Sequence, residues 1–292
     1  MRLARFSQNG RTRLGVVEGD MILDIGSADP TLPTDAGALL ADGGIARARA
    51  VLDRCGESID RIVLASARLE APIVRPPEFL AIGLNYAAHV AESGRERPEH
   101  PVVFNKQVSC VTGPFDPIEI PTVARSMVDY EGELGIVIGR RCRGVPHSRA
   151  AEVIAGYLIV NDVSVRDWQR ATPTMTMGKS WDTHGPIGPY VVTADEVPDP
   201  HDLRIRTWVD GELRQDASTT SMLTNCWQLI EHLSTAFTLL PGMIIATGTP
   251  EGVGIAMKPP GLLRAGQTVR IEIDGIGFIE NPVIDQPLTS TW

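Results

Sequence analysis

The chain has 292 residues, of which 43% are hydrophobic and 22% are charged, an ordinary composition for a globular protein with a large core. Its formal net charge of −9 argues against nucleic acid as a partner, because phosphate binding needs a basic surface. No apolar run reaches the roughly 18 residues of a membrane span, and the first residues lack the apolar centre of a signal peptide, so we expect a cytoplasmic protein that does not contact membranes.

The first 72 residues have the pattern of a small unit that contains both strands and helices. The segments 1–6 and 12–25 predict short strands, and 37–56 predicts helical structure interrupted by two adjacent glycines. A group of prolines then indicates a linker. We therefore expect a small N-terminal α+β domain over residues 1–72 and a main domain over residues 73–292.

The first half of the main domain alternates between apolar strands and short helices. Residues 79–86 predict a strand that enters a loop, and 86–94 predict a short helix that ends near a glycine. Residues 148–157 are a second helix candidate, and the apolar run at 157–163 predicts a buried strand.

The second half contains the clearest helix signal of the chain. In residues 221–240 apolar side chains recur at steps of three and four, which predicts one broad apolar face. Residues 268–283 alternate around an Asp-Gly pair and predict a β-hairpin. Because strands outnumber helices after residue 75, we predict a β-rich α+β fold.

One strand carries three carboxylates directly before an apolar run. In DYEGELGIVIG (129–139), Asp129, Glu131 and Glu133 alternate with other residues and therefore project from one face, with successive side chains about 7 Å apart. At an effective dielectric constant near 20, two such charges repel by roughly 2.4 kcal/mol. Either water screens this face, as on a solvated edge strand, or a cation lies on it.

A second apolar strand also ends in a carboxylate. Asp162 follows the buried run YLIVN, where an unpaired carboxylate would be unfavourable. Two strands that end in carboxylates suggest a shared site, and hard oxygen ligands favour Mg²⁺, Mn²⁺ or Ca²⁺. The alternative is an ion-pair network, because Arg166 and Arg170 are near in sequence and could neutralise these acids.

Two further motifs have both a catalytic and a structural interpretation. His89 and Glu92 are three residues apart on a predicted helix, so they share a face, and a histidine oriented by a carboxylate is a general-base arrangement; a surface pair is the alternative. Lys179 lies between methionines and a tryptophan, where it either extends to solvent or holds an anionic substrate. The glycine-rich segment 247–254 predicts a tight turn whose amides approach a small ligand, or a plain turn.

Four segments together carry a resemblance to a known family. GLNYAAHVAE, DYEGELGIVIG, GYLIVNDVSVRDWQ and IIATGTPEGVG occur in the order found in the fumarylacetoacetate hydrolase family, over roughly residues 70–285, in its bacterial acylpyruvase and 2-hydroxymuconate isomerase-like branch. The resemblance implies a mixed β-roll main domain, a homodimer and one divalent cation per subunit. It implies Glu131, Glu133 and Asp162 as ligands of Mg²⁺ or Mn²⁺, with Ca²⁺ as a further option.

The resemblance also implies roles for the remaining motif residues. His89 and Glu92 match a dyad that some members carry on a lid. The positions that contact the 2-oxo-carboxylate end of the substrate in similar enzymes are Arg166, Gln169, Lys179 and Thr249. One departure is Asn85, which stands about where some hydrolases of the family have an additional aspartate ligand.

The activity implied by the resemblance is metal-dependent cleavage of a C–C bond in a 1,3-dicarbonyl 2-oxo acid, with His89 activating water and a stabilised enolate as the leaving group. The same site could decarboxylate an oxaloacetate-like acid or isomerise a 2-hydroxymuconate-like acid, and the fold does not choose among these. A different class of function is a non-enzymatic binder whose acidic cluster holds a structural Ca²⁺.

Overall fold

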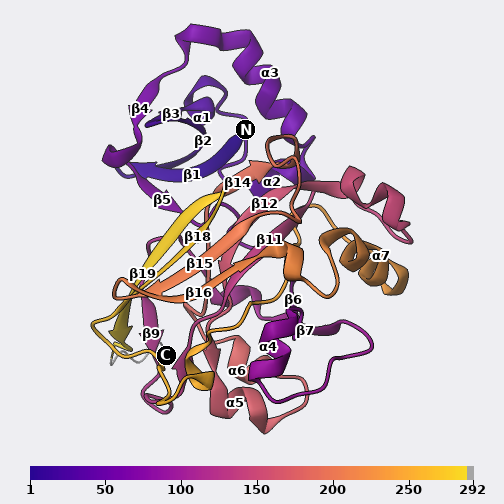
Figure 1. Ribbon diagram of the computed structural model, residues 1–292. Coiled ribbons are helices and arrows are strands. Elements are labelled where there is room, and N and C mark those ends of the chain that lie inside the picture. The colour runs from indigo at the N-terminus through magenta and orange to yellow at the C-terminus, as the bar shows by residue number, and fades with distance from the viewer. Residues whose placement is uncertain (288–292) are drawn as a thin grey trace.

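The computed structural model describes residues 1–287. A twelve-stranded mixed sheet crosses the molecule, and the N-terminal unit lies at one end of it (Figure 1). Its main path runs in the order β4 (Arg61–Val63), β3 (Met21–Leu23), β2 (Arg11–Glu18), β1 (Arg2–Gln8), β14 (Gly185–Thr193), β12 (Ile154–Asn161), β11 (Gly132–Ile138), β17 (Ile244–Ala246), β6 (Phe79–Gly83) and β7 (Val102–Lys106). Off this path, β5 (Arg68–Glu70) pairs with β1, and β8 (Val111–Thr112) pairs with β14.

A second sheet of five strands packs against the first. Its order is β16 (Glu212–Ser218), β15 (Arg204–Val209), β18 (Thr268–Ile273), β19 (Gly277–Asp285) and β9 (Ile118–Ile120). The strands β18 and β19 form the hairpin that the sequence predicts. A short pair, β10 (Val128–Asp129) with β13 (Ser164–Val165), lies next to the acidic segment.

The N-terminal unit continues the large sheet, because β1 pairs with β14 of the main domain. Its helices are α1 (Ile25–Ala28), α2 (Ala36–Ala41) and α3 (Ile45–Cys55), and the predicted interruption at two glycines separates the last two. The boundary at residue 72 stays a prediction.

The strand β12 explains why the middle of the chain contains such long apolar runs. All eight of its residues are buried, and alternate side chains such as Leu158 and Ile159 belong to two different hydrophobic clusters. Both faces of the sheet are therefore covered, which is typical of strands without polar alternation. The predicted β-rich α+β fold is confirmed.

Two helix predictions need correction. Residues 148–157 form a short 3-10 helix, His147–Val153, and then enter β12, because pairing with strands on both sides outweighs the local helical pattern. The predicted helix at 221–240 is shorter: α7 spans Cys226–Ala236, since Asn225 caps its start in a capping box with Gln228. At the ends of the predicted range, Met222, Leu239 and Leu240 pack against the core from non-helical segments, whereas Phe237 is exposed.

Three short helices gather at the end of the sheet opposite the N-terminal unit (Figure 1). They are α4 (Ala87–Glu92), α5 (Arg166–Ala171) and α6 (Thr176–Lys179), and each contributes a side chain to the cavity described below. Among the described residues, no helix is both long and apolar enough to cross a membrane.

Candidate active site

The antiparallel pairing of two strands brings the acidic residues together. Gly132 at the start of β11 is opposite Asn161 at the end of β12, so the residues just outside this pair are neighbours. The amide of Asp162 donates to the carbonyl of Glu131 at 2.9 Å. One oxygen each of Glu131, Glu133 and Asp162 lies within 4.8 Å of the others, and all three residues are buried. The two strands therefore bring their carboxylates to one shared site, as the sequence predicted.

Buried cations neutralise this cluster. The ammonium group of Lys179 lies 2.6 Å from Glu131 and 2.6 Å from Asp162. Arg166 donates to the other oxygen of Glu131 at 2.6 Å, and Lys106 donates to the other oxygen of Asp162 at 2.7 Å. The ion-pair alternative is therefore partly correct, but its members are Arg166 and two lysines. Lys179 does not extend to solvent, since its side chain is only 2% exposed.

Asp129 belongs to the support of the cluster. Its carboxylate pairs with Arg166 at 2.7 Å and accepts backbone hydrogen bonds from Gly254 at 2.8 Å and Ile255 at 3.0 Å. Arg166 is thus held between Asp129 and Glu131. Asp129 therefore lies beside the three converging carboxylates and holds Arg166 against Glu131.

The two glutamates of the strand have opposite electrostatic environments. Burial opposes ionisation of Glu131, but Lys179 and Arg166 outweigh it and hold the pKa of this carboxyl below its usual range. Burial and the adjacent carboxylates of Asp162 and Glu131 raise the pKa of Glu133 well above its usual range. In the metal-free protein, Glu131 is therefore the ionised member and Glu133 the carboxyl that favours its neutral form.

Glu131, Glu133 and Asp162 form an acidic triad, and in each of these carboxylates one oxygen accepts a hydrogen bond from a residue outside the triad. The fixed oxygens accept from Arg166 in Glu131, from Lys106 in Asp162, and from the amide of Gly248 at 2.7 Å in Glu133. Lys179 contacts the second oxygen of Glu131 and of Asp162, and one oxygen from each of the three carboxylates lies within 4.8 Å of the others. Three convergent carboxylate oxygens that already attract one cation fit Mg²⁺ or Mn²⁺, which prefer hard oxygen ligands.

The glycine-rich segment 247–254 donates its amides to carboxylates of the protein itself. Gly248 donates to Glu133, Gly252 to Glu92, and Gly254 to Asp129. At Gly252 φ is +97°, and an added Cβ would meet the carbonyl oxygen of Arg214 at 2.0 Å, so the loop needs glycine there. The sequence predicted a tight turn whose amides approach a small ligand, or a plain turn. In the structure these three amides donate to carboxylates of the protein and so orient acidic side chains.

His89 and Glu92 form the predicted pair on α4. The Nδ1 atom of His89 lies 2.7 Å from Oε1 of Glu92, and Oε2 of Glu92 accepts from the amide of Gly252 at 2.9 Å. A carboxylate can only accept, so Nδ1 of His89 donates to Glu92, and in the neutral imidazole Nε2 is then the basic nitrogen. The histidine side chain is 12% exposed, which keeps it accessible from the cavity.

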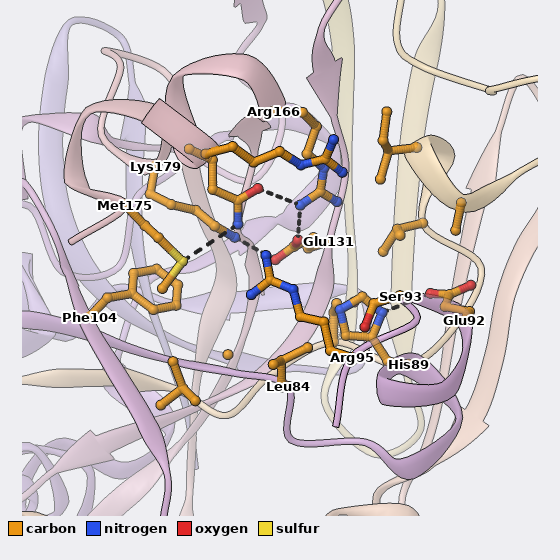
Figure 2. Close-up of a pocket in the computed structure, with 18 of the residues that line it drawn as sticks. Leu84, His89, Glu92, Ser93, Arg95, Phe104, Glu131, Arg166, Met175 and Lys179 are labelled. Atoms are coloured by element: carbon orange, nitrogen blue, oxygen red, sulfur yellow. Dashed lines mark hydrogen bonds and ion pairs between the residues drawn. The ribbon is translucent and has the colours of Figure 1, made fainter. Parts of the chain in front are cut away.

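The cavity beside the acidic cluster has a volume of about 250 Å³ (Figure 2). All but two of the predicted site residues line it: His89, Glu92, Glu131, Arg166, Gln169, Lys179 and Thr249. Glu133 and Asp162 are buried behind the wall, in contact with Gly248 and Lys179 respectively. The hydroxyl of Thr249 already donates to the carbonyl of Gly132 and accepts from Gln215. The roles of these residues stay predictions.

Asn85 does not contact the acidic triad. Its amide nitrogen donates to the carbonyls of Thr224 and Thr247, and its side-chain oxygen accepts from the amide of Thr224. The residue therefore joins the segment before α4 to two distant loops, and its hydrogen-bonding capacity is used by the backbone.

Sequence reasoning missed two kinds of residue. Lys106 lies at the end of β7, far from every motif, and no sequence pattern marked it. Arg95 follows α4 and points into the cavity (Figure 2). Arg170 on α5, which the sequence suggested only as an ion-pair partner of the acids, also lines it. Neither arginine has an ion-pair partner among residues 1–287, and both are exposed. The position of Arg95 directly after the predicted helix that carries His89 and Glu92 was the available signal.

Comparisons with known proteins cover nearly the whole chain. The family model described as fumarylacetoacetate (FAA) hydrolase C-terminal matches residues 78–284, and a model described as Rv2993c-like, N-terminal, matches residues 1–42. A protein of Burkholderia ambifaria is 44% identical over 280 residues, which cover 95% of this chain and 96% of that protein.

Two solved structures illustrate the range of similar proteins. A maleylpyruvate hydrolase from Sphingobium sp. SYK-6, in complex with manganese(II) and pyruvate, is 36% identical with a TM-score of 0.82, covering 98% of this chain and 100% of that one. A 2-hydroxyhepta-2,4-diene-1,7-dioate isomerase from Mycobacterium marinum is 34% identical with a TM-score of 0.76, covering 98% and 99%.

Proposed function

The chain belongs to the fumarylacetoacetate hydrolase family, and from this premise we propose that it is a divalent-metal-dependent hydrolase that cleaves a C–C bond in an acylpyruvate-type 2-oxo acid. The observation that carries the proposal is the placement of the His89–Glu92 pair on the same cavity as Glu131 and Lys179. Mg²⁺ or Mn²⁺, held by Glu131, Glu133 and Asp162, would supply Lewis acidity toward the 2-oxo acid and its enolate.

The histidine pair supports a hydrolytic step. With its Nδ1 proton held by Glu92, His89 presents Nε2 to accept a proton from a water molecule. That water adds to the distal carbonyl carbon, the C–C bond breaks, and the protonated histidine returns the proton to the carbon of the departing enolate. The products are a carboxylic acid and a pyruvate-type acid, and the histidine is restored.

The cationic wall supports binding of the 2-oxo-carboxylate end. Lys179 and Arg166 each touch Glu131, and Gln169 accepts from Arg166 at 3.0 Å while its amide nitrogen faces the thioether of Met175 at 3.8 Å. A carboxylate that enters the cavity meets these donors in a site shielded from water, where charge-assisted hydrogen bonds are strong.

The charge of the cavity favours a substrate with a second carboxylate. Lys179 and Arg166 are already paired with carboxylates of the protein, whereas Arg95 and Arg170 have no carboxylate partner within residues 1–287. Met175 provides part of the wall of the cavity, but Met177 is 58% exposed and does not line it. We therefore place a dicarboxylic 2-oxo acid ahead of one with a purely apolar tail. The name of the similar maleylpyruvate hydrolase is consistent with this choice.

An isomerase or a decarboxylase acting through the same site is the second candidate. The similar isomerase from Mycobacterium marinum supports an isomerase activity. Stabilisation of an enolate without attack by water would give either isomerisation or decarboxylation. The homodimer and the cytoplasmic location stay predictions.

The deciding experiment follows the ultraviolet enol band of an acylpyruvate, and in parallel the consumption of oxaloacetate, in the presence of Mg²⁺ or Mn²⁺. Cleavage to pyruvate that is lost in Glu131→Ala and in His89→Ala supports the hydrolase. Consumption of oxaloacetate alone, retained in His89→Ala, makes the protein a decarboxylase and contradicts the role of His89.

A further inference from the structure

Lysine is rare in this chain and is concentrated at the site. Only three of the 27 lysine and arginine residues are lysines, namely Lys106, Lys179 and Lys258. Two of them are buried in the acidic cluster, whereas Lys258 is exposed and has no ion-pair partner among the described residues. An ammonium group is a compact charge whose three donors can point in different directions, which a planar guanidinium cannot reproduce.

Lys106 contacts two different parts of the site at once. Its side chain is fully buried, and its ammonium group donates to Oδ1 of Asp162 at 2.7 Å and to the backbone carbonyl of Lys179. Lys179 in turn donates through its side chain to Oδ2 of the same Asp162 at 2.6 Å. The two lysines therefore divide the oxygens of one carboxylate between them, and Lys106 fixes the backbone from which Lys179 extends.

From this geometry we propose that Lys106 is a positioning residue: it holds Asp162 so that a single oxygen, Oδ2, faces the site, and it holds Lys179 in register with that oxygen. The inference rests on the proposed function, because it concerns the cation that the triad would bind. Groups that orient metal-binding side chains typically change metal affinity by 10- to 100-fold when they are removed.

A positioning role and a purely electrostatic role of Lys106 predict opposite changes in cation affinity when the side chain is removed. Losing a positive charge beside Asp162 would make the site more negative, so a purely electrostatic role predicts tighter cation binding in Lys106→Met. Losing the anchor frees the carboxylate to rotate and the Lys179 backbone to shift, so a positioning role predicts weaker binding. The sign of the change separates the two.

The test is calorimetric titration of the full chain with Mn²⁺. We expect Lys106→Met to bind Mn²⁺ 10- to 100-fold more weakly than the parent, and the matched control Lys258→Met to bind as the parent does. We also expect KM for an acylpyruvate to rise in Lys106→Met at saturating Mn²⁺, because Lys179 is displaced. Mn²⁺ affinity equal to or tighter than that of the parent overturns the proposal.

A second variant protects the test against loss of folding. Lys106→Arg keeps the charge but cannot place one donor atom on both acceptors, so we expect it to weaken Mn²⁺ binding as well. If Lys106→Met does not fold, as judged by circular dichroism, Lys106→Arg decides: binding at least tenfold weaker supports positioning, and binding within twofold of the parent overturns it. A parent protein that does not bind Mn²⁺ overturns the proposed function itself, which is a separate outcome.

Discussion

The carboxylate of Glu92 accepts a hydrogen bond from the backbone amide of Gly252, 160 positions further along the chain, at 2.9 Å. Its other oxygen is 2.7 Å from Nδ1 of His89. One side chain therefore sets the orientation and the tautomer of the histidine and also attaches α4 to the glycine-rich loop.

We expect Glu92→Gln to lower kcat by about 10²- to 10⁴-fold, the usual contribution of a positioned acid or base. The glutamine oxygen can still accept from Gly252, but its NH₂ group would face Nδ1 and move the histidine proton to Nε2. The measurement is steady-state kinetics with the cleaved 2-oxo acid. Glu96→Gln, on the exposed segment after α4, is the control and should behave as the parent does.

Glu131 and Glu133 should differ when each is replaced by glutamine in the metal-chelated protein. Glu131→Gln leaves Lys179 and Arg166 without a shared counter-charge, and we expect a loss of about 3–5 kcal/mol in the free energy of unfolding. Glu133→Gln should cost under about 1 kcal/mol, because the raised pKa means that this carboxyl already favours its neutral form. Urea unfolding in a chelator measures both, and equal losses would contradict the assignment.

The stability of the protein should fall in mild acid because of His184. Its side chain is buried, Nε2 is 2.8 Å from the carbonyl oxygen of Glu119, and burial lowers its pKa to about 4 from the usual 6.5. Between these values the unfolded chain binds a proton that the folded chain does not. This histidine therefore leaves stability unchanged above pH 6.5 and removes about 3 kcal/mol as the pH falls from 6.5 to 4.

Urea unfolding at pH 7.0 and pH 4.5 tests this assignment. The comparison is between the parent and His184→Gln, in which the amide can still donate to Glu119. We expect the free energy of unfolding to fall less between pH 7.0 and pH 4.5 in the variant than in the parent, because most of the contribution of His184 is lost. An unchanged difference between the two pH values would show that other groups cause the acid sensitivity.

Arg95 should select for a second carboxylate on the substrate. We expect Arg95→Met to lower kcat/KM for a dicarboxylic 2-oxo acid by roughly 10-fold or more, the range of a lost charge-assisted hydrogen bond. The value for a matched substrate with a methyl group in place of the distal carboxylate should change little. Arg97→Met, on the same loop but outside the wall of this cavity, is the control. Equal losses for both substrates would place Arg95 on the shared 2-oxo acid end.

Local patterns predicted much of the fold and the acidic residues of the site. The apolar run of β12 and the alternating carboxylates around the start of β11 could be found because both follow from strand geometry. The 3-10 helix before β12 was mistaken for a longer helix, because strand pairing on both sides is a tertiary effect that the local sequence does not contain.

The cations of the site were harder to predict than the acids. Lys106 lies on β7, the last strand in the order of the large sheet, whereas Asp162 directly follows β12 in the middle of that order. The two side chains nevertheless form an ion pair, which only the folded chain brings about. Arg166 was predicted as a substrate contact or as an ion-pair partner of the acids, but the local sequence did not show that Asp129 and Glu131 hold it together. Such contacts depend on chain folding over 35 to 56 positions.

The distribution of lysines also leaves one exposed lysine in the folded protein for an amine-reactive reagent, besides the N-terminal amino group, which pairs with Glu196. An amine-reactive reagent should modify Lys258 in the native state, while the burial of Lys106 and Lys179 protects them. Reaction at either buried lysine would require local opening of the site, so its rate, followed by peptide mass spectrometry, would report how often this end of the sheet opens. Slower labelling of the two buried lysines in the presence of Mn²⁺ or a 2-oxo acid would then measure binding without any turnover.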